Sequence, residues 1–223
     1  MFELDPVRFP RLAAYISRLP EGLESHPEAR CKASIARGLI DALPRPFDLE
    51  LLPPALRELV ERPPASTEWI LETLNTAIYV AAADYFFYED ENAYDEWVDQ
   101  IGAAVFSSPM YRILMFVASP RRLAKGAERR WSAFHRGSRY NTQLHDWGTE
   151  TVIEFPSFLF PRVALRAMAS AVRAAYRASG APNATVDILE LGEVHAVTRA
   201  VWFPEKFDAR GPDAAEERDP LRP

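Results

Sequence analysis

The chain has 223 residues, of which 48% are hydrophobic and 26% are charged, with 9 glycines and one cysteine. These proportions are typical of a globular protein and exclude a wholly disordered chain, a collagen and a disulfide scaffold. The formal charge of −6 argues against electrostatic binding of nucleic acid, which needs a clustered positive surface.

The first residues, Met1 to Asp5, include two acids and no long apolar run, which is not typical of a secretory signal. The densest apolar run, residues 113–118, is much shorter than the roughly 20 residues of a membrane span. Cys31 is the only cysteine, so no internal disulfide can form. We therefore expect a cytoplasmic protein without a membrane span.

Residues 1–136 are predicted to be mainly helical. Apolar residues recur there at intervals of three and four, and prolines and glycines separate the segments. Ser66 is expected to cap one helix, and Ser108-Pro109 and Ser119-Pro120 place a proline at the first helical position of two others. The predicted helices cover 9–19, 28–43, 66–80, 90–106 and 120–136, with a short amphipathic piece at 49–60 and a further helix that begins at Pro109.

After Gly137 the apolar period changes from about 3.6 to 2, which predicts strands. The expected strands are 140–145, 151–155, 184–191 and 195–203, with a helix at 161–179 between the two pairs. The turns within each pair are too short for a parallel crossover, so each pair is predicted to be an antiparallel hairpin. We expect the helix at 161–179 to cover one face of the sheet and the helix at 120–136 to cover the other.

The pattern predicts an α+β fold in which a helical N-terminal region precedes a β-β-α-β-β antiparallel sheet unit. Residues 1–203 are expected to form a single α+β domain, with 1–136 mainly helical and 137–203 as the β-β-α-β-β unit. Residues 204–223 lack apolar periodicity, so we expect a disordered tail there.

Several motifs carry a resemblance to a known family. SSPMYR at 107–112, SPRRL at 119–123 and RWSAFHRG at 130–137 resemble a family of myxobacterial paralogues that is known only as a domain of unknown function. The resemblance extends through ASGA at 178–181 and the segment from Val194 to Trp202. It covers most of Pro44 to Trp202, and none of these motifs is catalytic.

The layout is also similar to that of haem–nitric-oxide-binding and vinyl-reductase-like domains. That resemblance implies helices ahead of a small antiparallel sheet and the binding of small apolar ligands or partners. A haem would require a helix histidine that faces the sheet, and His135 is the one candidate. RGSRY at 136–140 has the residues of a Tyr-x-Ser-x-Arg propionate signature in the wrong order. We expect no cofactor, and haem stays open as the alternative.

The sequence predicts neither catalytic residues nor a metal site. The four histidines are scattered, and no HExxH, CxxC or GxSxG spacing occurs. Cys31 begins an amphipathic segment, and a lone cysteine in that setting is usually a small buried hydrophobic residue.

Aromatic and basic residues gather near the junction between the helical region and the sheet. Aromatic side chains there either fill the core or line an apolar pocket. The leading hypothesis is a non-catalytic module, accessory to a biosynthetic or regulatory pathway, that binds a small apolar ligand or a short peptide. A peptide could alternatively add as a strand to an open sheet edge. The candidate binding residues are Trp131, His135, Tyr140 and Trp147, with Arg121, Arg122 and Arg136 placed to meet a carboxylate.

Two alternatives belong to other functional classes. The first is an enzyme of specialised metabolism that uses His135 or His145 as a general base with a nearby acid such as Asp146. The second is a structural scaffold that forms a homodimer through its helices. A pocket with a histidine–carboxylate pair would favour the enzyme, and a flat apolar helical face would favour the scaffold.

Overall fold

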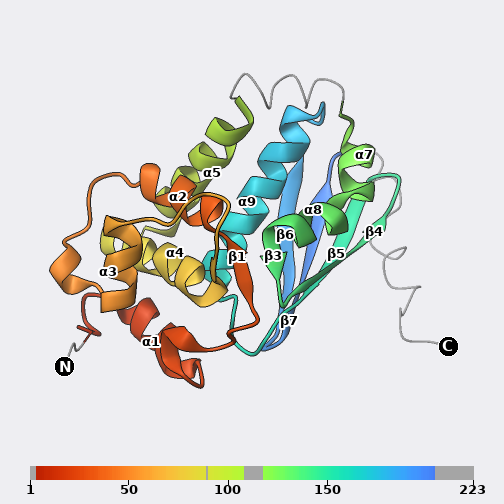
Figure 1. Cartoon of the computed structure of the whole chain (residues 1–223). Helices are drawn as coiled ribbons and strands as arrows, with labels where there is room; N and C mark the ends of the chain where they lie inside the picture. The colour runs from red at the N-terminus through yellow and green to blue at the C-terminus, as the bar shows by residue number, and fades with distance from the viewer. Residues whose placement is uncertain (1–3, 89, 108–117, 204–223) are drawn as a thin grey trace.

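The structure, a computed structural model, describes residues 4–88, 90–107 and 118–203 (Figure 1). Its helices are α1 (Pro10–Arg18), α2 (Ala33–Asp41), α3 (Pro54–Glu61), α4 (Glu72–Phe87), α5 (Glu91–Ser107), α7 (Pro120–Lys125), α8 (Ala127–Phe134) and α9 (Arg162–Ala178). Its strands are β1 (Arg30–Lys32), β2 (Trp69–Leu71), β3 (His135–Arg136), β4 (Arg139–Leu144), β5 (Gly148–Glu154), β6 (Thr185–Leu191) and β7 (His195–Val201). The α+β class is therefore confirmed. The helix predicted at Pro109 and the tail at 204–223 lie outside the described residues.

The C-terminal sheet has the strand order β4-β5-β7-β6, and each pair of neighbouring strands is antiparallel. The helix α9 lies between the two hairpins along the chain, so the β-β-α-β-β pattern is confirmed. Successive residues point to opposite faces of a strand. Ile153 of β5 is accordingly 2% exposed on the face toward α9, whereas Val152 is 37% exposed on the other face. We call these the inner face and the outer face of this sheet.

Among the described residues, the helices α7, α8 and α9 cover the inner face, so the expectation that the helix at 120–136 covers the opposite face is wrong. Leu123 and Ala124 of α7 pack in one cluster with Tyr176 of α9 and Ala200 of β7. Trp131 of α8 packs with Ile153 in the neighbouring cluster. In Figure 1, α7, α8 and α9 lie in front of the sheet. No helix of the described part of the chain packs on the outer face.

A second, smaller sheet of order β2-β1-β3 was not predicted. The segment expected to be helical from 28 starts instead as β1, and the one expected from 66 starts as β2, so Ser66 caps no helix and α4 begins at Glu72. The single helix expected at 120–136 is two helices that meet at Gly126, and the chain becomes extended at His135. Strands of two or three residues contain too few positions to show a period of 2, which explains why they were missed.

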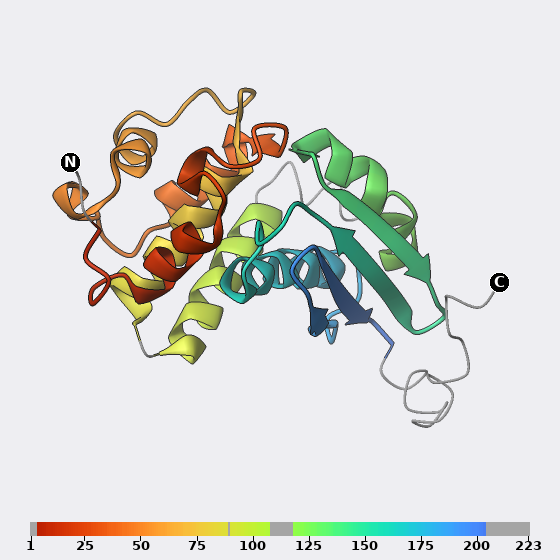
Figure 2. The same ribbon diagram turned by 90° about the horizontal axis from the view of Figure 1, so that it is seen from below.

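The helix α9 joins the helical region to the C-terminal sheet (Figure 2). Arg166 donates to Asp95 and Glu91 of α5, and Arg173 and Ser170 both donate to Asp99. The hydroxyl of Tyr94 also donates to the backbone oxygen of Val163 at 3.0 Å. These contacts fix α9 between the two parts. Within the described ranges, no helix is long and apolar enough to cross a membrane.

Gly137 joins β3 to β4 with a φ of 72°, a conformation that favours glycine. A Cβ atom there would lie 2.7 Å from the Cα atom of Ala29 and 2.9 Å from its nitrogen. We expect Gly137→Ala to lower the free energy of unfolding by about 1–3 kcal/mol, measured by urea titration. Gly38→Ala is the matched control, because its Cβ would meet nothing within 4 Å in α2. It should raise stability by about 0.5–1 kcal/mol, and equal effects of the two variants would contradict the account.

Candidate functional site

Three of the predicted binding residues come together in a stack of rings on the inner face. The ring centroid of Trp131 lies 3.8 Å from that of His135 and 4.9 Å from that of Tyr140. The indole Nε1 of Trp131 donates to the hydroxyl of Ser138 at 3.0 Å. Burial raises the pKa of Tyr140 to about 12, so its phenol stays neutral at physiological pH. The rings pack directly against one another.

The other predicted residues lie in different places. Trp147 is buried at the turn before β5, where its ring stacks on His145 with centroids 4.6 Å apart. Arg121 pairs with Asp146 at 3.7 Å, and Arg122 is exposed on α7. Arg136 is exposed and lies over the ring of Trp69 at 3.9 Å. The structure therefore does not gather the predicted aromatic and basic residues into one pocket, and their role in binding stays a prediction.

Glu72, at the start of α4, is the centre of a buried polar cluster that the sequence did not single out. Its side chain is 1% exposed. It accepts hydrogen bonds from Nδ1 of His135 at 2.8 Å, from Nδ2 of Asn75 at 2.9 Å and from the thiol of Cys31. A buried carboxylate is stable only when such donors satisfy it. The cluster therefore ties α4, β1 and β3 together.

This cluster is not equipped for nucleophilic chemistry. Cys31 is fully buried, as predicted, and burial raises the pKa of its thiol far above the ordinary value, with a further contribution from the charge of Glu72. The protonated thiol is a weak nucleophile. In the part of the chain that the structure describes, no group of three or more histidine, cysteine or acidic side chains is placed to hold a metal ion.

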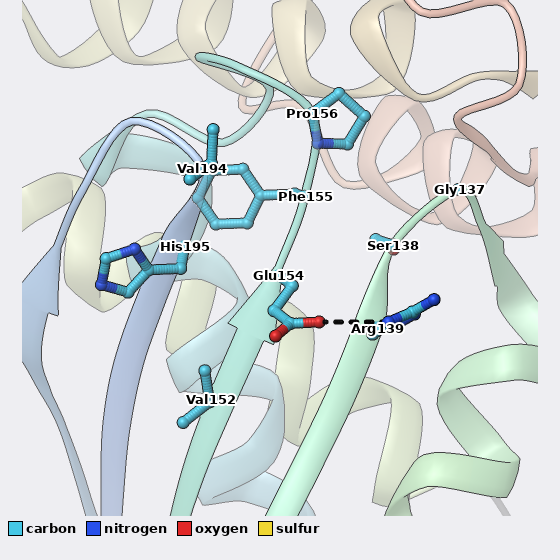
Figure 3. A pocket seen from close by; sticks show the side chains of 9 residues that line it. All are labelled: Gly137, Ser138, Arg139, Val152, Glu154, Phe155, Pro156, Val194 and His195. Carbon is cyan, nitrogen blue, oxygen red and sulfur yellow. Dashed lines mark ion pairs between the residues drawn. The ribbon is translucent and has the colours of Figure 1, made fainter. Parts of the chain in front are cut away.

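A pocket of about 690 Å³ opens on the outer face of the C-terminal sheet (Figure 3). The start of β4, the end of β5 with the loop after it, and the turn before β7 form its walls. It is lined by Gly137, Ser138, Arg139, Val152, Glu154, Phe155, Pro156, Val194 and His195. None of the residues predicted to bind a ligand is among them. We call it the sheet pocket.

The sheet pocket combines apolar and charged side chains. Figure 3 shows Phe155 beside Val194, with Val152 further along the same strand. Arg139 and Glu154 form an ion pair of 3.9 Å at one side. His195 lies at the other side, and its Nε2 is 2.8 Å from Oε1 of Glu190. A ligand there would meet an apolar surface between two polar groups.

Backbone hydrogen bonds hold the end of the sheet pocket in place. Phe155 donates to the oxygen of Val194 at 2.9 Å, and Phe158 donates to that of Glu193 at 2.8 Å. These bonds extend the pairing of β5 with β7 into the loops. The sequence contained no signal for this pocket, because its residues have the ordinary composition of strands and turns.

No protein-family model and no curated protein matches this chain. Among solved structures, a haem protein studied for the modulation of haem redox potential through protein-induced porphyrin distortion is similar to it, with a TM-score of 0.50 and 11% sequence identity. The match covers 76% of this chain and 99% of that chain. At this identity the likeness concerns the fold alone. It supports the expected likeness to a haem-binding type of fold, while the resemblance to the myxobacterial family stays a prediction.

Replacing Glu72 tests the buried cluster. We expect Glu72→Ala to lower the free energy of unfolding by about 3–5 kcal/mol, because it leaves buried donors, including His135, without their acceptor. Urea titration followed by circular dichroism measures the loss. Glu61→Ala, at an exposed position that ends α3, is the control and should change stability by no more than about 0.5 kcal/mol. A similar, small effect of both variants would refute the role of Glu72.

The reactivity of Cys31 tests the environment of its thiol. In the folded protein at about pH 8, we expect Ellman's reagent to react with Cys31 only as fast as the chain unfolds, because the thiol is buried and protonated. The same protein in urea should react completely. Ser132→Cys adds an exposed thiol on α8 and serves as the reactive control. Rapid reaction of Cys31 in the native wild-type protein would contradict this account.

Proposed function

We propose that this chain is a non-catalytic module that binds a small apolar ligand or a short peptide in the sheet pocket. The observation that carries the proposal is a pocket of about 690 Å³ on the face of the sheet that no described helix covers. Small-molecule sites generally have volumes of roughly 300–1,000 Å³ and combine apolar walls with a few polar groups. The sheet pocket has both properties.

The side chains around the sheet pocket indicate the chemistry of the ligand. Val152, Phe155 and Val194 offer contacts to an apolar body. Arg139 and Glu154 offer one charge of each sign, so they can pair with an anionic or a cationic group. A short peptide with apolar side chains satisfies both requirements, because its amides and termini supply the polar partners.

The ring stack at Trp131 supports a location for the ligand away from the helix-to-sheet junction. The ring of Trp131 stacks on the rings of both His135 and Tyr140. A ligand between these rings would have to separate contacts that the protein already makes. The sheet pocket requires no such rearrangement.

Haem is a second ligand to consider, because the similar solved structure belongs to a haem protein. His135, its candidate ligand here, is bonded through Nδ1 to Glu72 and stacked on Trp131, and its side chain is only 10% exposed. A porphyrin bound through this imidazole needs a wide apolar slot beside the ring, where packed side chains lie instead. The residues around His135 therefore do not fit a haem.

The pair of His195 and Glu190 favours the enzyme alternative, since His195 lines the sheet pocket. Its side chain is 37% exposed and that of Glu190 is 60% exposed. Such an exposed pair lies in contact with water, whereas catalytic groups usually act in a site from which water is excluded. This favours binding over catalysis.

Titration with the fluorescent probe anilinonaphthalene sulfonate tests the sheet pocket. We expect saturable binding that shifts the amide NMR signals of 137–139, 152–155 and 194–195. Val152→Glu should weaken binding by about tenfold, equivalent to about 1.4 kcal/mol, because it replaces an apolar contact with a charge that repels the sulfonate. Leu189→Glu is the matched control, since Leu189 is exposed on the same sheet but outside the pocket. Equal losses in both variants, or no saturable binding, would overturn the proposal.

A further inference from the structure

The small sheet β2-β1-β3 has an outward face that is strongly cationic. Cys31, Ile70 and His135 are register partners on its buried side. The residues next to them therefore point to the opposite side, because side chains alternate along a strand. This second side carries Arg30 and Lys32 from β1, Trp69 and Leu71 from β2, and Arg136 from β3. We call it the cationic face.

Two cations converge on one indole in the cationic face. Lys32 Nζ lies 4.2 Å from the ring centroid of Trp69, and the guanidinium carbon of Arg136 lies 3.9 Å from it. Since β1 lies between β2 and β3, Trp69 and Arg136 meet across the middle strand. The cation–π contacts hold these positive charges close together at the surface.

Arg30 and Arg136 stand directly opposite each other in the pairing of β1 with β3. Like charges at opposed positions destabilise a sheet. Arg30 donates to the backbone oxygen of Pro27 at 2.9 Å, and Lys32 donates to that of Thr67 at 2.7 Å. Within the described ranges, the ion pairs of the structure include no carboxylate on Arg30, Lys32 or Arg136. An acidic residue at position 30 or 136 would instead stand opposite an arginine.

The positive charge continues from the cationic face along the chain. Residues 121–139 contain seven basic residues and one acidic residue, in a chain whose net charge is −6. Figure 1 shows α8 and β3 beside β1, so the part of this segment from Ala127 to Arg136 lies next to the cationic face. Arg121 pairs with Asp146 at the turn before β5 and Arg139 lies on the outer face, so the part of this charge nearest the cationic face comes from α8 and β3.

We propose that the cationic face binds an acidic peptide segment of a partner protein. The peptide carboxylates would pair with Arg30, Lys32 and Arg136, and its aliphatic groups would contact Leu71. Three short strands span about 10 Å in each direction, which matches a few residues of an extended peptide. A single-stranded nucleic acid fits less well, because its bases stack on free aromatic faces, and Trp69 is already engaged by two cations.

Fluorescence anisotropy with a labelled octaglutamate peptide at low salt tests the proposal. We expect saturable binding that weakens as salt is added. Arg136→Glu should weaken it by about tenfold or more, because a carboxylate then replaces a cation at the centre of the face. The same variant loses the contact with Trp69 but places Glu opposite Arg30, so its urea midpoint should stay close to that of the wild type. This separates a loss of binding from a loss of fold.

Arg62→Glu is the matched control, because Arg62 is exposed at the end of α3 and the change in net charge is identical. It should alter the affinity by no more than about twofold. Lys32→Gln provides a second variant in the cationic face and should also weaken binding. The proposal would be overturned by no binding of octaglutamate, by equal losses in Arg136→Glu and Arg62→Glu, or by tighter binding of an oligothymidylate of equal charge. Dimerisation of the wild-type chain that Arg136→Glu abolishes would also overturn it, in favour of a second copy as the occupant.

Discussion

The carboxylate of Glu72 is the constraint on which the arrangement of the two sheets depends. A buried charge is tolerated only where several donors satisfy it, and Glu72 obtains donors from β1, β3 and its own helix. Two of these donors, Cys31 and His135, are register partners. The buried hydrogen bonds and the strand pairing therefore specify the same geometry. The position of β3 in turn sets where Gly137 turns the chain and where β4 begins.

The ring stack at Trp131 follows from the same constraint. His135 is held through Nδ1 by Glu72, so its imidazole presents one face to Trp131. Trp131 then packs on Tyr140, the second residue of β4. The hydrogen bond from His135 to Glu72 in the helical region thus helps to position the rings that pack on the inner face of the C-terminal sheet. The rings of Trp131, His135 and Tyr140 therefore pack between the two parts, while their role in binding stays a prediction.

The sequence predicted the long elements and missed the short ones for a physical reason. The helix α9 and the four strands of the C-terminal sheet carry enough residues to show a clear period, and their positions agree with the prediction. The strands β1, β2 and β3 contain two or three residues each, so their pattern was absorbed into the neighbouring helices. Glu72 resembles any acid in the first turn of a helix, since only tertiary contacts reveal that it is buried. The sheet pocket was missed because the sequence does not show which face of a sheet the helices cover.

The short segment 135–139 contributes side chains to the buried cluster at Glu72, to the cationic face and to the sheet pocket. His135 points inward to Glu72, and Arg136 points outward to Trp69 because successive strand residues alternate. The turn at Gly137 then starts a new strand, so that Arg139 reaches the outer face of the C-terminal sheet beside Glu154. The cationic face and the sheet pocket are therefore separated by a single turn of backbone with a positive φ. The two proposed sites therefore share one short segment of backbone, and Gly137 is packed against Ala29 at its centre.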